Sequence, residues 1–420
     1  MKTIQAALAV AACVTLLTNV RGDLALDYSN KGTDGQFRPT ANVVVDLAAA
    51  ATNSWDAIPT IASRGVYDPE KWAVVFKYSA VNIPAGVTVT FKNHPSRAPV
   101  VWLVDGDVVV RGKVDVSAKA PLPGRSSEGG PGGFRGGMVS TALGYDNGLG
   151  LGPGGGWTLL GGSYGTVVVA NSAENGKISI APYGSASLMP LVGGSGGGGY
   201  GSPDPAIGWG GGGGGAVLVV SRTVLSLDGE IVAEGVASVH GESPGSGGAI
   251  RLVADTMAGS GILRAAGKSS RFSISGNGRI RLEAKTSQAS YDTVPETIVV
   301  PPIESEAIWG RTNLPTAQIV SINGQPVSPD PRGEWTTGVS PDVTLRSPGE
   351  VPVTIRCRNL PTNSVVTVRA VLKRNPVEGF GGNKLLNARF VSGDELESTW
   401  TAALPPVPGF RMLQVVARSP

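Results

Sequence analysis

Residues Gly193 to Gly235 read GGSGGGGYGSPDPAIGWGGGGGGAVLVVSRTVLSLDGEIVAEG, and this stretch decides the fold. Six consecutive glycines, Gly210 to Gly215, lead directly into β-rich sequence from Ala216 to Leu227. An Asp228-Gly229 turn follows, and a second apolar run resumes at Glu230. Short runs rich in valine and leucine that are bounded by glycine turns are typical of β-strands.

The same strand–turn–strand pattern recurs along the chain. Val217 aligns with Ile250 at an offset of 33 residues, and Ile250 aligns with Ile280 at an offset of 30 residues. A single unit of this kind cannot bury its apolar face alone, so the units are expected to stack. The sequence therefore predicts an all-β solenoid, a right-handed parallel β-helix with glycine-rich loops. Copies of the pattern lie at Pro99–Val116, Gly248–Ala265 and Gly278–Ala284.

The N-terminal residues predict export. Lys2 is followed by the apolar run Ile4 to Leu17, and the small residues near Gly22 offer a cleavage site, so residues 1–22 are expected to be a signal peptide. The run is shorter than the roughly 20 apolar residues that a membrane span needs. We therefore expect a secreted or cell-surface protein with no membrane span after signal removal.

Charge and cysteine content narrow the function classes. The formal net charge is +3, and loss of Lys2 and Arg21 with the signal leaves +1. This balance, with no basic cluster among aromatics, argues against nucleic acid as a partner. Cys13 leaves with the signal, so Cys357 stands alone, and we expect it to face inward on a strand as a small apolar residue.

The composition changes twice along the mature chain. Of the 61 glycines, 33 lie in residues 121–220, where they alternate with short apolar runs. We expect these glycines to form ordered loops that lie against the solenoid wall. The expected organisation is an N-terminal cap with the first coils over 23–93, the glycine-rich β-helix over 94–292, and a proline-rich linker over 293–314.

Residues 315–420 read as a separate β domain. Seven short strands in just over 100 residues, most of them separated by proline or Asn-Gly turns, predict an antiparallel β-sandwich of immunoglobulin-like size. The Cys-Trp-Cys core signature of antibody domains is absent, so only the architecture is predicted. The expected strands are Gln318–Ile322, Asp342–Arg346, Val351–Arg358, Ser364–Leu372, Leu385–Val391, Ser398–Leu404 and Met412–Ala417.

Four segments of the chain carry a resemblance to a known group of proteins. They are VNIPAGVTVTFKNHPSRAPVVWLVDGDVVVRGKVDV, GGGGGGAVLVVSRTVLSLDGEIVAEG, GGAIRLVADTMAGSGILRAAG and GRIRLEA. The chain resembles secreted, glycine-rich parallel β-helix proteins of environmental bacteria, in which an Ig-like domain often follows a pectin-lyase-like solenoid. The resemblance implies the fold and the export route. It carries over no catalytic residue.

Charged side chains are expected on the outer wall of the solenoid. In the run from Asp107 to Val116 the valines at 108, 110, 114 and 116 share one face, and Asp107, Arg111, Lys113 and Asp115 share the other. Stacked carboxylates and arginines suit a calcium-dependent lyase, but charge ladders of both signs also keep a β-wall soluble. We favour the solvated ladder and expect no metal. Further outward charges are expected at Glu230, Glu234, Arg264, Arg279, Arg281 and Glu283.

The sequence lacks most of the residues that other enzyme signatures require. His240-Gly241 and Arg279-Ile280-Arg281 echo the later motifs of polygalacturonases, but the Asn-Thr-Asp and Asp-Asp carboxylate motifs are absent from the sequence. The chain has two histidines, which leaves little for a histidine triad or a multi-histidine metal site. The glycine run at Gly193 to Gly201 has no Lys-Ser/Thr pair after it, so it is not a P-loop. We predict no cofactor.

Aromatic residues on the glycine-rich segments are the remaining candidates. If exposed, they would form a platform for sugars or for another protein; if buried, they would anchor segments that have few side chains to pack. Anchoring is the favoured interpretation. The aromatic residues are Tyr145, Trp157, Tyr164, Tyr200 and Trp209.

The sequence thus predicts an exported, non-enzymatic structural or adhesive protein of the cell surface or extracellular matrix. The alternative is a carbohydrate-active β-helix protein, a polysaccharide lyase, hydrolase or binder, with its site on the outer wall. Expected partners are a polysaccharide, other cell-surface proteins or a second copy of the chain. No catalytic residue is predicted. The candidate binding residues are Asp107, Arg111, Asp115, Trp157, Tyr200, Trp209, Glu230 and Glu234.

Overall fold

The structure is a computed structural model, and it describes most of the chain. The described residues are 28–120, 126–137, 150–156, 160–172, 176–199, 209–237, 243–270, 273–297, 299–302, 308–309, 315–328, 341–372, 383–406 and 411–418.

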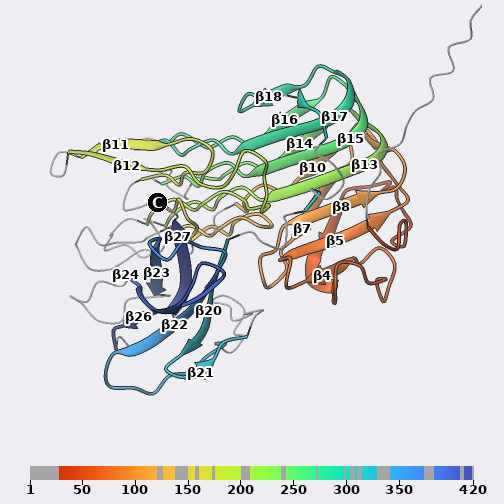
Figure 1. Cartoon of the computed structure of the whole chain (residues 1–420). Coiled ribbons are helices and arrows are strands. Elements are labelled where there is room, and N and C mark those ends of the chain that lie inside the picture. The colour runs from red at the N-terminus through yellow and green to blue at the C-terminus, as the bar shows by residue number, and fades with distance from the viewer. Residues whose placement is uncertain are drawn as a thin grey trace, which may run out of the picture.

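The described chain is all-β, and its one helical element is a single 3-10 turn, η1 (Leu47–Ala49). Two curled, mostly parallel sheets occupy the part before residue 303 (Figure 1). The eleven-stranded sheet contains β1 (Gln36–Phe37), β3 (Ala51–Thr52), β4 (Val66–Asp68), β5 (Ala73–Tyr78), β6 (Ala80–Ile83), β8 (Val100–Val104), β9 (Val108–Val110), β13 (Ala216–Leu227), β15 (Ala249–Gly259), β17 (Arg279–Ala289) and β19 (Val299–Val300). The six-stranded sheet contains β2 (Val43–Asp46), β7 (Thr88–Lys92), β10 (Lys113–Asp115), β14 (Glu230–Val232), β16 (Ile262–Arg264) and β18 (Asp292–Val294).

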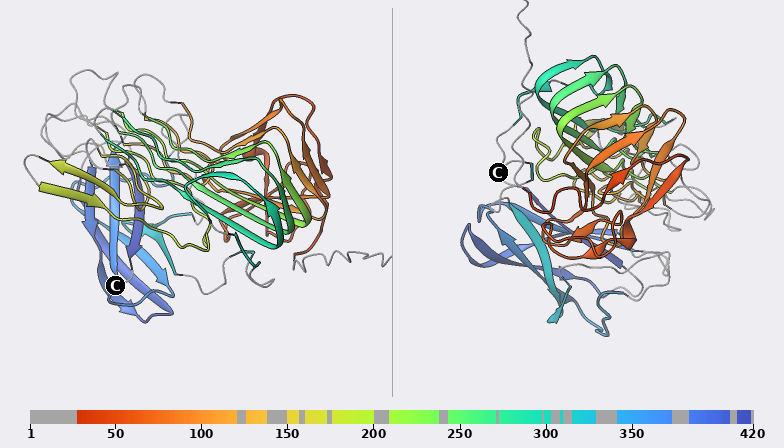
Figure 2. Two further views of the ribbon diagram at one scale, coloured as in Figure 1. Left: turned by 90° about the horizontal axis from the view of Figure 1, so that it is seen from above. Right: turned by 90° about the vertical axis from the view of Figure 1, so that its right-hand side faces the viewer.

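The strand register confirms the predicted offsets. Val217 pairs in parallel with Ile250, and Ile250 pairs with Ile280. On its other side Val217 pairs with Val100 of the earlier copy. The first three copies therefore place strands in both sheets, the copy at Gly278–Ala284 adds β17, and the copies lie side by side in the order of the chain (Figure 2).

The space between the two sheets holds the main apolar core. Val108, Val110, Val114 and Val116 are all buried there, as the alternation predicted. Trp102 packs among Phe37, Tyr78 and Phe91 in the same core. Burial of this continuous row of valine, leucine and aromatic side chains is the main force that holds the copies together.

The outer face of the eleven-stranded sheet is also covered, which corrects one expectation. Glu283, predicted on a solvated wall, is only 1% exposed. Its Oε1 accepts hydrogen bonds from Arg251 Nε at 2.8 Å and from Arg281 Nε at 2.7 Å, and Arg251 donates to the carbonyl of Ile308 at 2.7 Å. The ring of Trp309 lies 5.1 Å from that of Trp55. Residues 308–309 therefore return over this face and bury the ion pair.

The glycine-rich segments pack on one another, and we call them the glycine layer. Gly194 N donates to Gly214 O at 2.8 Å, and three residues later Gly197 N donates to Gly211 O at 2.9 Å. Hydrogen bonds to segment 126–137 follow the same spacing. A period of three is that of the extended polyproline II helix, which has no hydrogen bonds within its own chain. The layer comprises residues 126–137, 150–156, 160–165, 191–199, 209–215 and 243–248.

Segment 191–199 lies at the centre of the glycine layer and is hydrogen-bonded to each of its other segments. Most of its residues are buried, and six of the nine are glycines with no side chain to bury. The sequence predicted ordered glycine loops but not this arrangement, in which the backbones of the glycine segments are one another's main partners. Two of the apolar runs in this region form an antiparallel hairpin, β11 (Val168–Ser172) with β12 (Gly176–Ile180), at the end of the molecule away from β13 (Figure 1).

Residues 315–418 form two antiparallel sheets around one core. The five-stranded sheet contains β20 (Thr316–Ile322), β21 (Gln325–Pro326), β22 (Val351–Arg358), β25 (Arg389–Gly393) and β26 (Glu397–Leu404). The three-stranded sheet contains β23 (Val365–Leu372), β24 (Asn383–Asn387) and β27 (Arg411–Arg418). Side chains of β22, β23 and β26 meet in the shared core, and Cys357 is fully buried there, as predicted. Burial raises the pKa of its thiol to about 11.

Two predicted strands of this region differ in the structure. Residues 342–346 are irregular, because Pro341 and Pro348 bracket them and proline cannot donate to a strand ladder. The predicted strand 385–391 is divided at Ala388, where the chain passes from the three-stranded to the five-stranded sheet. Strands that change sheets in this way are common at the corners of β-sandwiches.

Part of the segment expected to be a linker continues the sheets. Thr293 and Val294 belong to β18, and β19 pairs in parallel with Leu282 and Glu283 of β17. The paired strands therefore extend past residue 292, to Val300.

Candidate functional site

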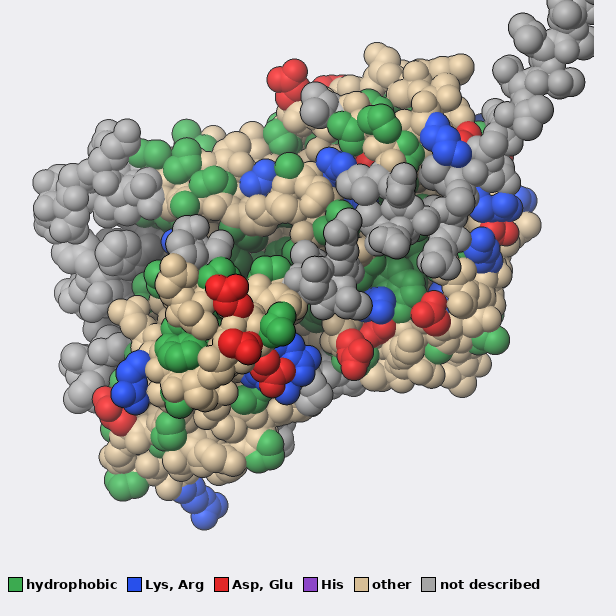
Figure 3. Space-filling model, viewed as in Figure 1, with side chains coloured by type: hydrophobic (Ala, Val, Ile, Leu, Met, Phe, Trp, Pro, Cys, Tyr) green, Lys and Arg blue, Asp and Glu red, His purple; other side chains and the backbone are tan. Residues whose placement is uncertain are grey.

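The outer wall of the six-stranded sheet carries the predicted charge ladder, and its charges are paired. Lys113 Nζ lies 3.4 Å from Asp115 Oδ2 and 3.8 Å from Glu230 Oε2, the residue opposite Lys113 on the next strand. Lys268 Nζ lies 2.7 Å from Glu234 Oε2. Acidic and basic side chains are likewise interspersed on the face in Figure 3. Pairs of opposite charge across neighbouring strands stabilise a sheet.

Asp107 has a different place from the other predicted wall residues. Its Oδ1 accepts hydrogen bonds from Thr223 Oγ1 at 2.5 Å and from the backbone N–H of Val224 at 3.3 Å. The register between β13 and β15 shifts between Ser221 and Val224, so Asp107 holds a β-bulge where the sheet bends. Arg111 is exposed at the next turn. The structure thus separates Asp107 from the ladder of Asp115, Glu230 and Glu234.

This division predicts unequal effects of two substitutions. Glu230→Gln removes one charge from a half-exposed pair and is expected to change the free energy of unfolding by no more than about 0.5 kcal/mol. Asp107→Ala leaves the two donors of the bulge without their acceptor and is expected to cost about 1–2 kcal/mol. Urea denaturation of both variants measures the difference, and equal losses would contradict the assignment.

Among the predicted aromatic residues, Tyr164 is an anchor. It is 1% exposed, its ring lies 4.6 Å from that of Tyr183, and the guanidinium carbon of Arg279 lies 5.6 Å from its centre. Burial raises the pKa of the Tyr164 phenol. Trp209 is half-buried at the start of segment 209–215. Trp157, Tyr200 and Tyr145 lie outside the described residues.

The C-terminal sheets dock on the glycine layer through Arg369, a residue that no sequence motif indicated. Arg369 is 7% exposed, and its guanidinium donates to the carbonyls of Gly150, Gly152 and Pro153. Gln414 Oε1 accepts a hydrogen bond from Gly152 N at 2.9 Å. Burial, together with the nearby charge of Arg418, lowers the pKa of Arg369 to about 10. A charged residue alternating with valine and threonine in β23 was its only sequence signal.

Removing this contact is expected to loosen the docked C-terminal sheets. Arg369→Ala removes the buried donor of the Gly150 carbonyl and one donor each of the Gly152 and Pro153 carbonyls, and hydrogen bonds to charged groups are worth about 1.5–3 kcal/mol. We expect the urea midpoint to fall accordingly. Arg358→Ala is the control, because Arg358 pairs with Glu397 at the surface and its side chain is 52% exposed. A loss as large in the control would show that the buried contacts of Arg369 are not what stabilises this junction.

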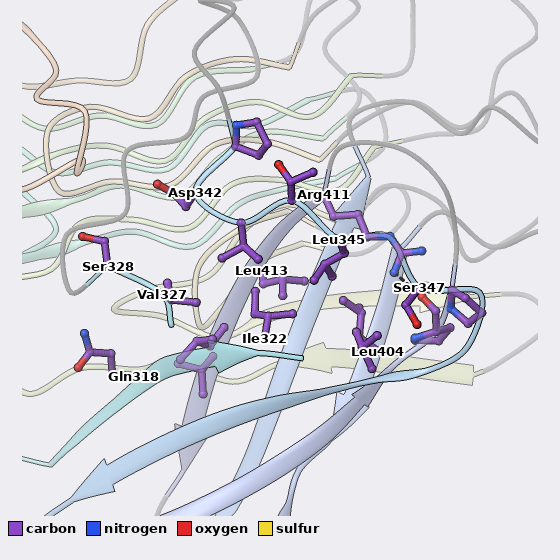
Figure 4. A pocket seen from close by; sticks show the side chains of 18 of the residues that line it. Gln318, Ile322, Val327, Ser328, Asp342, Leu345, Ser347, Leu404, Arg411 and Leu413 are labelled. Atoms are coloured by element: carbon purple, nitrogen blue, oxygen red, sulfur yellow. Dashed lines mark hydrogen bonds between the residues drawn. The ribbon is translucent and has the colours of Figure 1, made fainter. Parts of the chain in front are cut away.

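A groove of about 890 Å³ opens between the two C-terminal sheets. Its apolar lining comes from Ile319 and Ile322 of β20 and from Leu413 and Val415 of β27. Leu345 lies between them, and Arg411 borders one end with a hydrogen bond to Pro405 O at 2.9 Å (Figure 4). The volume is within the range of about 300–1,000 Å³ that ligand sites have. No sequence pattern indicates this groove, because residues nearly 100 positions apart line it.

Comparison of the chain with known protein families, curated proteins and solved structures found no match. In the described part of the chain, no helix is long and apolar enough to cross a membrane. No group of three or more His, Cys, Asp or Glu side chains in the same described ranges is arranged to hold a metal ion.

Proposed function

We propose that this chain is an exported, non-enzymatic structural or adhesive protein of the cell surface or extracellular matrix. The stacked copies would form a right-handed parallel β-helix, and residues 315–420 would form an Ig-like β-sandwich at one end of it. The parallel register at offsets of 33 and 30 residues supports the first assignment. The two antiparallel sheets around one core support the second.

The functional proposal rests on the partners of the polar groups in the described outer wall and glycine layer. The wall carboxylates pair with lysines of neighbouring turns, and many peptide groups of the glycine layer hydrogen-bond to one another. Arg369 then fixes the C-terminal sheets to that layer. Polar groups arranged in this way hold the chain in one shape, as a load-carrying or spacing protein requires.

Two experiments test the proposal. Fractionation of producing cells, followed by electron microscopy of the fraction that holds the protein, should place it outside the cell in a surface or matrix assembly. Recovery in the cytoplasm would contradict export.

The second experiment tests for catalysis. Incubation of the purified protein with a panel of polyuronates is expected to release no unsaturated product and no reducing ends, with or without calcium. Calcium is expected to leave the melting temperature unchanged, since a bound ion would raise it by mass action. Product release that is lost in Asp115→Asn or Glu230→Gln variants would instead establish the carbohydrate-active alternative.

A further inference from the structure

The groove between the C-terminal sheets is bordered by two strand edges. Among the described residues β27 pairs with β23 alone, so the hydrogen-bonding groups along its other side are paired with no strand. On the opposite side of the groove, β20 pairs with β22. Within the described ranges its second edge pairs with β21 at Ser321 and Ile322, and Val320 O accepts a hydrogen bond from Val327 N at 2.9 Å. An open strand edge is a template for a further strand.

The side chains below these edges suit an extended peptide. Leu413 and Val415 alternate along β27 and pack against the shared core of the two sheets, and Ile319 and Ile322 reach the same core from β20. These residues are half-buried. Side chains at alternate positions of an added strand point to the same face. A strand lying along β27 would therefore place every second side chain against this apolar floor.

The charged residues at the rim of the groove favour a bound peptide with an acidic end. Arg346 and Arg411 line the groove, and Asp342 is the acidic residue among its lining side chains. Arg97 also lines it, but its guanidinium is 2.6 Å from Glu128 Oε2. Arg411 likewise donates to Pro405 O, so an acidic group on the bound strand would meet the rim at Arg346.

We propose that this groove binds an extended segment of another polypeptide by β-strand addition along β27. The segment has apolar residues at alternate positions and an acidic residue at one end. Backbone hydrogen bonds to β27 provide affinity, and the apolar floor selects the alternating side chains. This interaction goes beyond the proposed structural or adhesive role. Its test uses the purified full chain, so the result does not depend on whether the protein is exported.

The test uses three labelled peptides and fluorescence anisotropy. The first, TVTVTVTD, has the alternation and the acidic end. The second, TTTTVVVD, has the same composition without alternation, and the third is TVTVTVTD with N-methyl groups on its valines. We expect TVTVTVTD to bind at least about tenfold more tightly than either control, because only it satisfies both the floor and the strand edge. Equal binding of the three peptides, or no binding of TVTVTVTD, would overturn the proposal.

Hydrogen exchange locates the bound peptide without any substitution. The amides of β27 should gain protection, whereas those of β25, which is also an edge strand, should not. Protection of β25 instead of β27 would refute the assignment. In the variant test, Leu413→Glu should weaken binding at least about tenfold, and Leu396→Glu, at a residue that is 74% exposed, should leave it unchanged. Melting temperatures show whether both variants fold.

Two other occupants would be recognised by the same assay. Dodecanoate that binds while TVTVTVTD does not would identify a site for apolar small molecules and overturn the proposal. Ser328 and Pro341, which border residues 329–340, both line the groove. Binding that occurs only when residues 330–339 are replaced by a short Gly-Ser linker would assign the groove to the chain's own segment and equally overturn it.

Discussion

Replacing Gly213 by alanine is expected to unfold the protein under conditions in which the Gly349→Ala variant stays folded. A Cβ on Gly213 would overlap the carbonyl carbon and oxygen of Gly194 and come within 2.8 Å of Ser195 N. These are backbone atoms of the central segment 191–199, so no side chain can move aside. Overpacking a tight core costs about 1–3 kcal/mol or more, and here we expect at least the upper end.

Thermal unfolding followed by circular dichroism measures this difference. At Gly349 an added Cβ would meet no atom within 4 Å, so that variant isolates the effect of the methyl group itself. An unchanged melting temperature in the Gly213→Ala variant would mean that the backbones of the glycine layer are not in close contact at this position.

Glu283→Gln is expected to be the most destabilising change of a single charge. The substitution leaves the buried, positively charged Arg251 without its counter-ion, and breaking a buried pair in this way costs about 3–5 kcal/mol. Glu397→Gln, in a pair whose side chains are more than half exposed, is expected to cost less than about 1 kcal/mol. The double variant Arg251→Met/Glu283→Leu should recover most of the loss, because apolar residues can replace a buried ion pair.

Glu283 also makes the free energy of unfolding depend on pH, in a direction that follows from its pKa shift. Burial by itself would raise the pKa of the Glu283 carboxyl, but the hydrogen bonds and charges of Arg251 and Arg281 outweigh it and hold the pKa below its ordinary value of 4.5. The charged carboxylate therefore stabilises the fold above the pKa of the unfolded chain, and this stabilisation is lost as the pH falls through the folded value.

Urea denaturation at a series of pH values tests this sign. The difference in stability between the wild type and Glu283→Gln should shrink as the pH falls below about 4.5. A difference that stays constant to pH 3 would show that the carboxylate is not what Arg251 requires.

The strand register was predictable because side-chain pattern and turn chemistry agree. Val217, Ile250 and Ile280 each stand two residues after a glycine that opens a copy, and the apolar alternation then fixes which side chains face inward. A slip of one residue would turn every valine outward. The exposed wall pairs of Asp115 and Glu230 follow from the same alternation.

The glycine layer was not predictable from the same signals. Hydrophobic periodicity detects helices and strands through side chains, and glycine has none to detect. The threefold spacing is visible only in backbone hydrogen bonds such as Gly194 N to Gly214 O. The burial of Glu283 and the docking of Arg369 were missed for a different reason. Each depends on a partner far along the chain, Ile308 in one case and Gly150 to Pro153 in the other.

The glycine layer also sets the order in which the chain can fold. Strands β5, β7, β8 and β10 find their first partners within a few dozen residues of one another. Segment 160–165, by contrast, is hydrogen-bonded to Pro244 and to Gly276, so the layer cannot close until the chain is complete to that point. Ordering glycine costs more backbone entropy than ordering any other residue. During synthesis we therefore expect the glycine segments that are made first to stay hydrated while the valine-rich strands assemble.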